Sequence, residues 1–314
     1  MFDTDFFRVL PSNHCMRQRL EYLPLWLSLR FLGALPRPLA HAMGIALARL
    51  VYLVHGKLRR VGMRNLAIAF PERSKAEHRR ILRTVFDGMG RQLAEFSRFP
   101  KYTRENLHEV AVYEGFEALE EPRKRGKGVL FLTGHFGAWE VGSFAHSLYG
   151  HPIKIVVRDL DNPLVDGLVR HYRTLHGNVT IDNREFLRSL LSSMRAGETV
   201  GILMDTNMTP PQGVFVDFFG TLACTAAGMA RVAMKTGAAV VPAYTLWDPA
   251  LKKYKVCFEP ELEIVHTGDT EHDVTANTAI FTKALEKIIR AHPDQWLWVH
   301  RRWKTRPPGE APVY

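Results

Sequence analysis

Two titratable side chains, His135 and Glu140, follow an apolar run at 129–132 in the stretch Gly-Val-Leu-Phe-Leu-Thr-Gly-His-Phe-Gly-Ala-Trp-Glu, residues 128–140. On one continuous helix, residues five apart point about 140° away from each other, so these two can meet only across a turn. Gly134 and Gly137 flank His135-Phe136 and supply the backbone freedom for that turn. The pattern predicts a buried strand with His135 at its carboxyl end, then a helix with Glu140 in its first turn.

This pair of side chains is suited to making an alcohol nucleophilic. A histidine accepts the hydroxyl proton and a carboxylate orients and stabilises the imidazolium, which typically contributes about 10²–10⁴-fold to the rate. Glu140 would then fix the tautomer of His135, and the nucleophile would belong to the substrate. The structural alternative is a helix-capping acid beside a hydrogen-bonded histidine. The sequence has no Gly-x-Ser-x-Gly, His-Glu-x-x-His or Cys-x-x-Cys motif, so it indicates neither a serine nucleophile nor a metal site or other cofactor.

A second acid, Asp205, follows an apolar run at 200–204. Side chains that follow parallel strands gather at one edge of the sheet, so Asp205 is a candidate to share a cleft with His135. The residue is equally well explained, from the sequence alone, as a turn former ahead of Pro210-Pro211.

Three arginines are candidates to bind phosphate. Arg158 follows a predicted strand at 153–157, and Arg170 and Arg173 lie three residues apart on the next predicted helix, hence on one face of it. Guanidinium groups bind phosphate bidentately. Each arginine taken singly is also explained as a solvated charge or a salt-bridge partner.

The order of the predicted elements indicates an α/β fold. Helical patterns alternate with short apolar runs, which argues for a mixed, largely parallel central sheet flanked by helices. Strands are predicted at 129–132, 153–157, 200–204 and 239–246, edge-like strands at 253–260 and 262–266, and helices near 163–175, 184–194, 225–236 and 274–291.

The formal net charge of +10 favours anionic partners, such as a phosphate-bearing lipid, a membrane surface, an acidic carrier protein or a nucleic acid. Charge alone does not choose among them. The three cysteines are widely spaced, which argues against a disulfide framework and for a reducing compartment.

Two apolar segments, 23–35 and 39–54, lie near the N-terminus, and Pro-Arg-Pro at 36–38 separates them. Both fall short of the roughly 20 residues that cross a hydrocarbon core, and arginines and lysines surround them. We therefore predict a membrane-associated helical hairpin within residues 1–62, held by apolar burial and charge, ahead of an α/β domain at 63–314. The alternative is a buried helical pair with solvated ends.

Several motifs resemble those of the bacterial lipid A biosynthesis (lysophospholipid) acyltransferase family, which has a glycerolipid-acyltransferase-like fold. The block Thr-Gly-His-Phe-Gly-Ala-Trp-Glu at 133–140 is similar to the His-x4-Asp/Glu block of these enzymes in its Glu form. The further landmarks follow in order: Val-Arg-Asp-Leu-Asp-Asn-Pro at 157–163, Arg173, Asp205, Phe-Phe-Gly at 218–220 and Trp-Val-His-Arg-Arg-Trp-Lys-Thr-Arg-Pro at 298–307.

This resemblance implies an acyltransferase that moves a fatty acyl group from an acyl carrier protein or acyl-CoA thioester to a hydroxyl of an anionic glycolipid, such as a lipid A precursor, or of a lysophospholipid. It implies His135 and Glu140 as the catalytic dyad, with substrate-binding roles for Arg158, Arg173 and Asp205. The expected location is the cytoplasmic face of the inner membrane, as a peripheral or monotopic protein.

Two other functions remain open at this point. A basic nucleic-acid-binding protein would fit the charge and the tail at 296–306, where tryptophans alternate with arginines, but it leaves His135 and Glu140 unexplained. A lipid hydrolase would use the same dyad to activate water.

Overall fold

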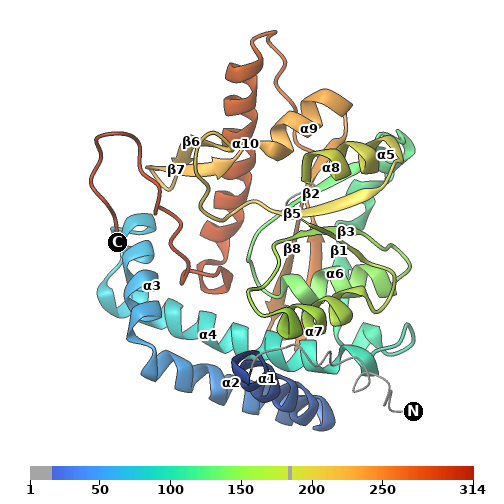
Figure 1. The fold of residues 1–314 in the computed structure, drawn as a ribbon, viewed down its shortest axis with the longest axis vertical. Helices are drawn as coiled ribbons and strands as arrows, with labels where there is room; N and C mark the ends of the chain where they lie inside the picture. Colours follow the sequence, from blue (N-terminus) through green and yellow to red (C-terminus); the bar gives the residue numbers. More distant parts are fainter. Residues whose placement is uncertain (1–15, 183–185) are drawn as a thin grey trace.

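The computed structural model describes residues 16–182 and 186–314, which form a mixed α/β fold (Figure 1). The α-helices are α1 (Met16–Ala34), α2 (Arg37–Val54), α3 (Gly56–Ala69), α4 (Lys75–Arg98), α5 (Glu120–Lys124), α6 (Trp139–Leu148), α7 (Pro163–Thr174), α8 (Phe186–Arg195), α9 (Gly228–Thr236) and α10 (Thr270–Ala291). The strands are β1 (Ala111–Glu114), β2 (Val129–Thr133), β3 (Lys154–Val157), β4 (Val179–Asp182), β5 (Thr199–Leu203), β6 (Gly213–Phe218), β7 (Thr221–Ala226), β8 (Ala239–Asp248) and β9 (Lys253–Phe258).

A seven-stranded sheet in the order β1-β9-β8-β2-β5-β3-β4 forms the centre of the fold. All neighbouring strands pair parallel except β8 and β9, which form an antiparallel hairpin. The predicted mixed, largely parallel sheet with flanking helices is therefore confirmed. Strands β6 and β7 form a separate two-stranded antiparallel sheet.

The side chains of β2 alternate between the two faces of the sheet, and both faces are buried. Val129 and Phe131 pack in one core with residues of α4, α6 and α7. Leu130 and Leu132 pack in another with residues of α8, α9 and α10. This double burial explains why β2 is a continuous apolar run rather than an alternating one.

Two of the predicted elements differ from those in the structure. The run at 262–266 forms no strand: Leu262 donates one hydrogen bond to Val240, and Val265 is bound by the side chain of Asn277. The helix predicted from 225 starts at Gly228, because Thr225 pairs with Val214 in the β6–β7 hairpin. The predicted start of the 184–194 helix lies outside the described residues.

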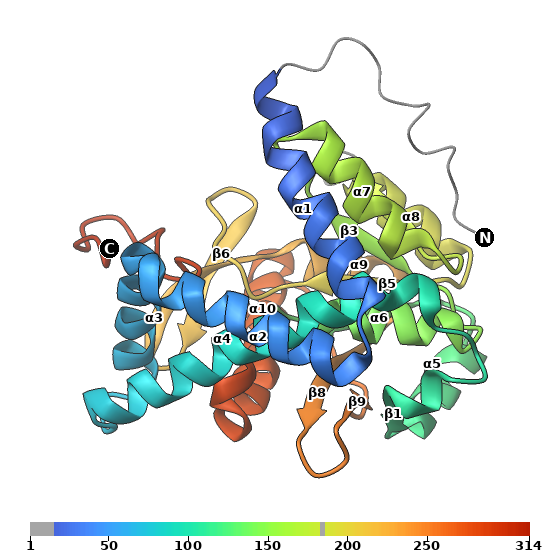
Figure 2. The same cartoon turned by 90° about the horizontal axis from the view of Figure 1, so that it is seen from below.

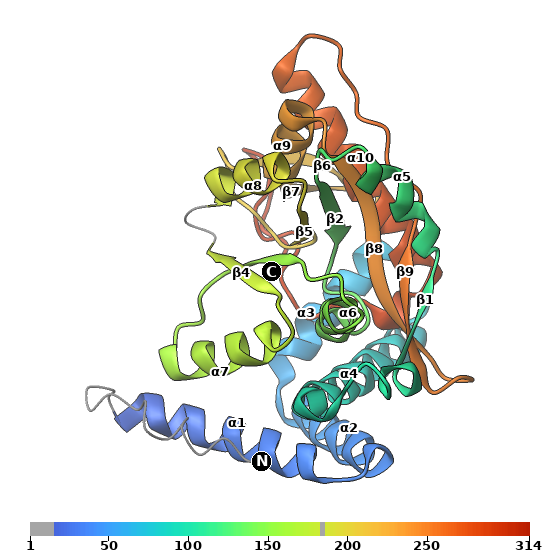
Figure 3. The same ribbon diagram turned by 90° about the vertical axis from the view of Figure 1, so that its right-hand side faces the viewer.

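Helices α1, α2 and α4 lie together at one end of the molecule, at the bottom of Figures 1 and 3, and Figure 2 shows α2 running beside α4. Glycines allow this close packing. A Cβ atom at Gly90 of α4 would overlap the backbone of Gly44 in α2, and one at Gly33 of α1 would overlap the Ser97 carbonyl. The boundary predicted after residue 62 falls inside α3, and the division into two parts stays a prediction.

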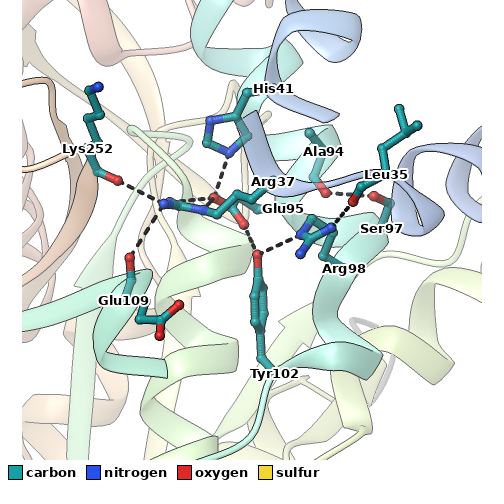
Figure 4. A network of polar contacts seen from close by, with 10 residues as sticks. All are labelled: Leu35, Arg37, His41, Ala94, Glu95, Ser97, Arg98, Tyr102, Glu109 and Lys252. Atoms are coloured by element: carbon teal, nitrogen blue, oxygen red, sulfur yellow. Dashed lines mark hydrogen bonds and ion pairs between the residues drawn. The ribbon is translucent and has the colours of Figure 1, made fainter. Parts of the chain in front are cut away.

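A buried polar network also joins α2 to α4 (Figure 4). Glu95 of α4 is fully buried, and its carboxylate lies 2.7 Å from Arg37 Nη2 and 2.7 Å from His41 Nε2, both on α2. The hydroxyl of Tyr102 also donates to it. Removing one partner of such a buried network leaves an uncompensated charge, so this contact fixes α2 on α4.

The tryptophan-rich tail is core rather than surface. Trp296, Trp298 and Trp303 are at most 1% exposed and pack against Phe218 and Phe219 of the β6–β7 hairpin. These three side chains therefore cannot form the nucleic-acid surface that the composition of the tail would also suit. The tryptophans alternate with arginines in the tail because the indoles pack against α3 and the β6–β7 hairpin.

The contact between α2 and α4 yields a stability prediction. Gly90→Ala should destabilise the protein by about 1–3 kcal/mol, because the added methyl group would overpack the contact with Gly44 even though alanine favours helix. Gly167→Ala in α7 is the matched control, since a Cβ atom there meets nothing within 4 Å. Denaturant unfolding measures both, and equal stability of the two variants would contradict this packing.

Candidate active site

His135 stands in a turn between the carboxyl end of β2 and the start of α6, as predicted from its two flanking glycines. Gly137 has φ +54°, and a Cβ atom there would overlap the Thr245 carbonyl oxygen. A Cβ atom at Gly134 would lie 3.0 Å from the carboxylate of Asp205. Both glycines are thus required by close approach, and together they let the turn place the imidazole at the end of the sheet.

The partner of His135 is Asp205. The Nδ1 atom of His135 lies 2.9 Å from Asp205 Oδ1, and the backbone N–H of His135 donates to Asp205 Oδ2 at 2.7 Å. The register explains the meeting, because Thr133 of β2 pairs with Leu203 of β5 and the two chains continue side by side. Since an ionised carboxylate only accepts, Nδ1 is the protonated nitrogen of the neutral ring and Nε2 holds the lone pair.

The two groups stabilise each other's charge. Burial acts to lower the pKa of His135, but the charge and hydrogen bond of Asp205 outweigh it, with a smaller effect from Glu140, and the pKa is raised. Burial likewise acts to raise the pKa of Asp205, yet the neighbouring His135 lowers it well below its usual range. The indole of Trp296 adds a hydrogen bond to Asp205 Oδ2 at 2.8 Å. Asp205 is therefore an anion near neutral pH.

Glu140 lies in the first turn of α6, as predicted. Among the described residues, however, no hydrogen bond joins its carboxylate to the imidazole of His135. Its carboxylate accepts from Arg173 Nε at 3.1 and 3.0 Å, from a second Arg173 nitrogen, and from the Trp139 indole at 3.2 Å. The expected orienting contact from Glu140 to His135 is thus replaced by one from Asp205. The reason is that the guanidinium of Arg173 on α7 binds the Glu140 carboxylate through two of its nitrogens.

The structure separates the three candidate arginines. Arg173 joins the site through Glu140. Arg170 binds Asp166 and Asp159, and its side chain is committed to those contacts. Arg158 is exposed, and its guanidinium lies 3.5 Å from the carboxylate of Asp161.

A pocket opens beside His135 on the side of α4. Its walls come from α4, the catalytic turn, the β8–β9 hairpin and the segment after α10. The lining residues are Val85, Gly88, Met89, Arg91, His135, Gly137, Ala138, Trp139, Trp247, Tyr254, Asp294, Gln295, Trp296 and Leu297. In the part of the chain that is described, no three His, Cys, Asp or Glu side chains gather as a metal site.

The backbone N–H groups of the catalytic turn are occupied. Those of His135, Phe136, Gly137 and Ala138 donate to Asp205, Gly134, Gln295 and Thr245. These four N–H groups are therefore not free to bind a reacting oxyanion. The first turn of α6 begins one residue later, and the first N–H groups of a helix have no intrahelical acceptor.

Trp296 is a site residue that the sequence did not reveal. A buried indole N–H needs a hydrogen-bond acceptor, which could have pointed to Trp296. The sequence around Trp296, however, does not indicate which residue that acceptor is. The pocket-lining residues of α4 were also missed, because the sequence pattern at 75–98 is that of an ordinary amphipathic helix.

Residues 15–305 match the family model described as bacterial lipid A biosynthesis acyltransferase. The chain is 28% identical over 291 residues to the lipid A biosynthesis lauroyltransferase of Escherichia coli (strain K12), covering 92% of each chain. It is 25% identical to the lipid A biosynthesis palmitoleoyltransferase of the same strain, also covering 92% of each. It is 27% identical to a lipid A biosynthesis acyltransferase of Haemophilus influenzae, covering 93% of this chain and 94% of that one.

The match spans the catalytic turn, Asp205 and most of the tail, so it includes every part of the site described above. The chain therefore belongs to the bacterial lipid A biosynthesis acyltransferase family and is an acyltransferase.

Proposed function

We propose that this enzyme transfers a fatty acyl group from a thioester to a hydroxyl of a lipid A precursor. The observation that carries the mechanism is the hydrogen bond between His135 Nδ1 and Asp205, which leaves the basic Nε2 atom at a pocket. The acceptor class comes from the family, whose matched members are named for lipid A biosynthesis.

In the proposed reaction, Nε2 of His135 takes the proton from the acceptor hydroxyl as its oxygen attacks the thioester carbonyl carbon. A carbon–oxygen bond forms and the carbonyl becomes a tetrahedral oxyanion. The carbon–sulfur bond then breaks, and the leaving thiolate takes the proton from the His135 imidazolium. Asp205 stabilises that imidazolium throughout and holds the ring in one tautomer.

Glu140 and Arg173 have a supporting role in this proposal. Glu140 fixes the guanidinium of Arg173, and its charge adds to the negative field on His135. Arg173 and the first N–H groups of α6 are the donors that we assign to the oxyanion. The substrate-binding role expected for Arg173 is kept as part of this proposal, whereas the exposed position of Arg158 gives it no support.

We assign the acyl donor to an acyl carrier protein or to acyl-CoA. Both carry the acyl group on a phosphopantetheine thioester and both are anionic, which suits a chain of net charge +10. Activity with the two donors at equal concentration decides between them.

We also propose that α1 and α2 lie on the cytoplasmic surface of the inner membrane. Their exposed apolar side chains recur every three or four residues, which puts them on one face of each helix: Leu20, Leu23, Leu27 and Phe31 on α1, and Leu39, Met43, Leu47, Leu50 and Val54 on α2. Among the described helices, α2 alone is long and apolar enough to cross a membrane. Its opposite face is bound to α4 through Arg37 and His41, which favours a helix lying on the surface.

Replacing His135 tests the chemistry. His135→Ala should lower the rate of acyl transfer by about 10²–10⁴-fold, because the general base is lost, while the circular dichroism spectrum stays unchanged. Mass spectrometry of products with and without the lipid acceptor is the assay. Free fatty acid as the sole wild-type product in the presence of the acceptor would instead identify a hydrolase.

Glu140 and Arg173 should behave as one unit. Glu140→Ala and Arg173→Ala should each lower kcat/KM, and the double variant should be little worse than the worse single one, since each side chain holds the other. Losses that multiply in a double-mutant cycle would show that Arg173 acts on the substrate independently of Glu140.

The apolar surface of α1 and α2 can be made polar without changing any buried side chain. Combined replacement of Leu27, Phe31 and Leu47 by glutamine should release the protein from vesicles of phosphatidylethanolamine and phosphatidylglycerol in a flotation assay. The control variant carries glutamine in place of Leu187, Leu222 and Leu251, whose side chains are similarly exposed but do not belong to α1 or α2. Equal binding of both triple variants would contradict the assignment.

A further inference from the structure

Arg91 of α4 lies in the active-site pocket without an assigned role. Its side chain lines the same pocket as His135. The Cζ atom of Arg91 lies over the ring of Trp247, 5.1 Å from its centroid, and the Nε atom is buried with no hydrogen-bond partner. A buried N–H donor without an acceptor is costly, so this group is suited to a ligand that supplies one.

The neighbouring carboxylates are used elsewhere. Glu95, one helical turn along α4, is bound by Arg37, His41 and Tyr102 (Figure 4). Asp294 also lines the pocket, but no ion pair joins it to Arg91. Across residues 16–182 and 186–314, no carboxylate lies within ion-pair distance of Arg91, whereas Arg173 is held by Glu140.

Gly88 lies three residues before Arg91, on the same face of α4, and lines the same pocket. A glycine inside a helix weakens it, so it needs a reason. Gly90 has one in its contact with Gly44, but a Cβ atom at Gly88 would meet nothing within 4 Å. The space beside Gly88 therefore belongs to the pocket and not to the packing of the protein.

We propose that Arg91 binds a phosphate ester of the substrate in this pocket, and that Gly88 leaves the space which that group occupies. The proposal rests on the proposed acyl transfer and adds a binding residue to it. A guanidinium held against an indole presents its N–H groups in a fixed fork, and this fork matches two oxygens of a phosphate. Phosphate esters occur both in the phosphopantetheine arm of the donor and in the lipid A precursor.

Steady-state kinetics with each substrate varied in turn tests the role of Arg91. Arg91→Ala should raise KM for one phosphate-bearing substrate by about 10- to 100-fold, the loss expected for hydrogen bonds to a charged group, with kcat changed far less. Arg91→Lys should restore part of the loss, because a point charge replaces the fork. Arg80→Ala, on the exposed face of the same helix, is the control and should leave both KM values unchanged.

Two arms identify the source of the phosphate. If it belongs to the acceptor, the effect of Arg91→Ala should disappear with a precursor treated with phosphatase. If it belongs to the donor, the effect should disappear with an acyl-N-acetylcysteamine thioester, which lacks phosphate. An effect of equal size with both phosphate-free substrates, or unchanged KM values for both substrates in Arg91→Ala, would overturn the proposal.

Gly88→Leu tests the space independently of charge. It should raise KM for the same substrate as Arg91→Ala does, whereas Gly167→Leu on α7, at another open glycine, should not. An unchanged KM in Gly88→Leu would show that the space is not used.

Equilibrium binding separates this proposal from the proposed function. The His135→Ala protein, with Arg91 intact or replaced by alanine, is titrated with acyl-CoA, acyl carrier protein and the phosphorylated precursor. Weaker binding of one of them on loss of Arg91 supports the site even if the wild-type enzyme shows no transfer to lipid. Identical binding of all three contradicts it.

Discussion

The contact between His135 and Asp205 is the constraint on which the rest of the site depends. Parallel pairing of β2 with β5 brings the ends of two strands together, and a turn with two required glycines aims the imidazole at the carboxylate. Burial would otherwise neutralise both groups, yet each stabilises the charge of the other. The buried indole of Trp296 completes the carboxylate's contacts, which makes the tail part of the site.

The helical layer gives this site its second wall. Helix α4 meets the pocket on one face and meets α2 on another, where glycines and the Glu95 network hold the two helices together. Apolar side chains of α2 that do not contact α4 remain exposed. The proposed membrane surface and the active-site pocket are therefore both bordered by one packed pair of helices.

Local patterns predicted the elements that carry chemistry, because the strand at 129–132, its flanking glycines and the helix after it are each visible in sequence. The partner of His135 was not predictable in this way, since a spacing of five residues suggests Glu140 while the strand register selects Asp205. The position of the tail tryptophans in the core was not predictable for a related reason. Alternation with arginines resembles a surface, and only the β6–β7 hairpin, itself missed, shows what covers them.

The pH dependence of kcat/KM tests most directly whether Asp205, rather than Glu140, governs His135. As the proposed general base, His135 acts in its neutral form, so activity should fall as pH drops through the raised pKa of His135. Asp205→Asn removes the larger stabilising charge and should move this acid limb to lower pH, by more than Glu140→Gln does. An acid limb that stays in place in Asp205→Asn but moves in Glu140→Gln would contradict the account.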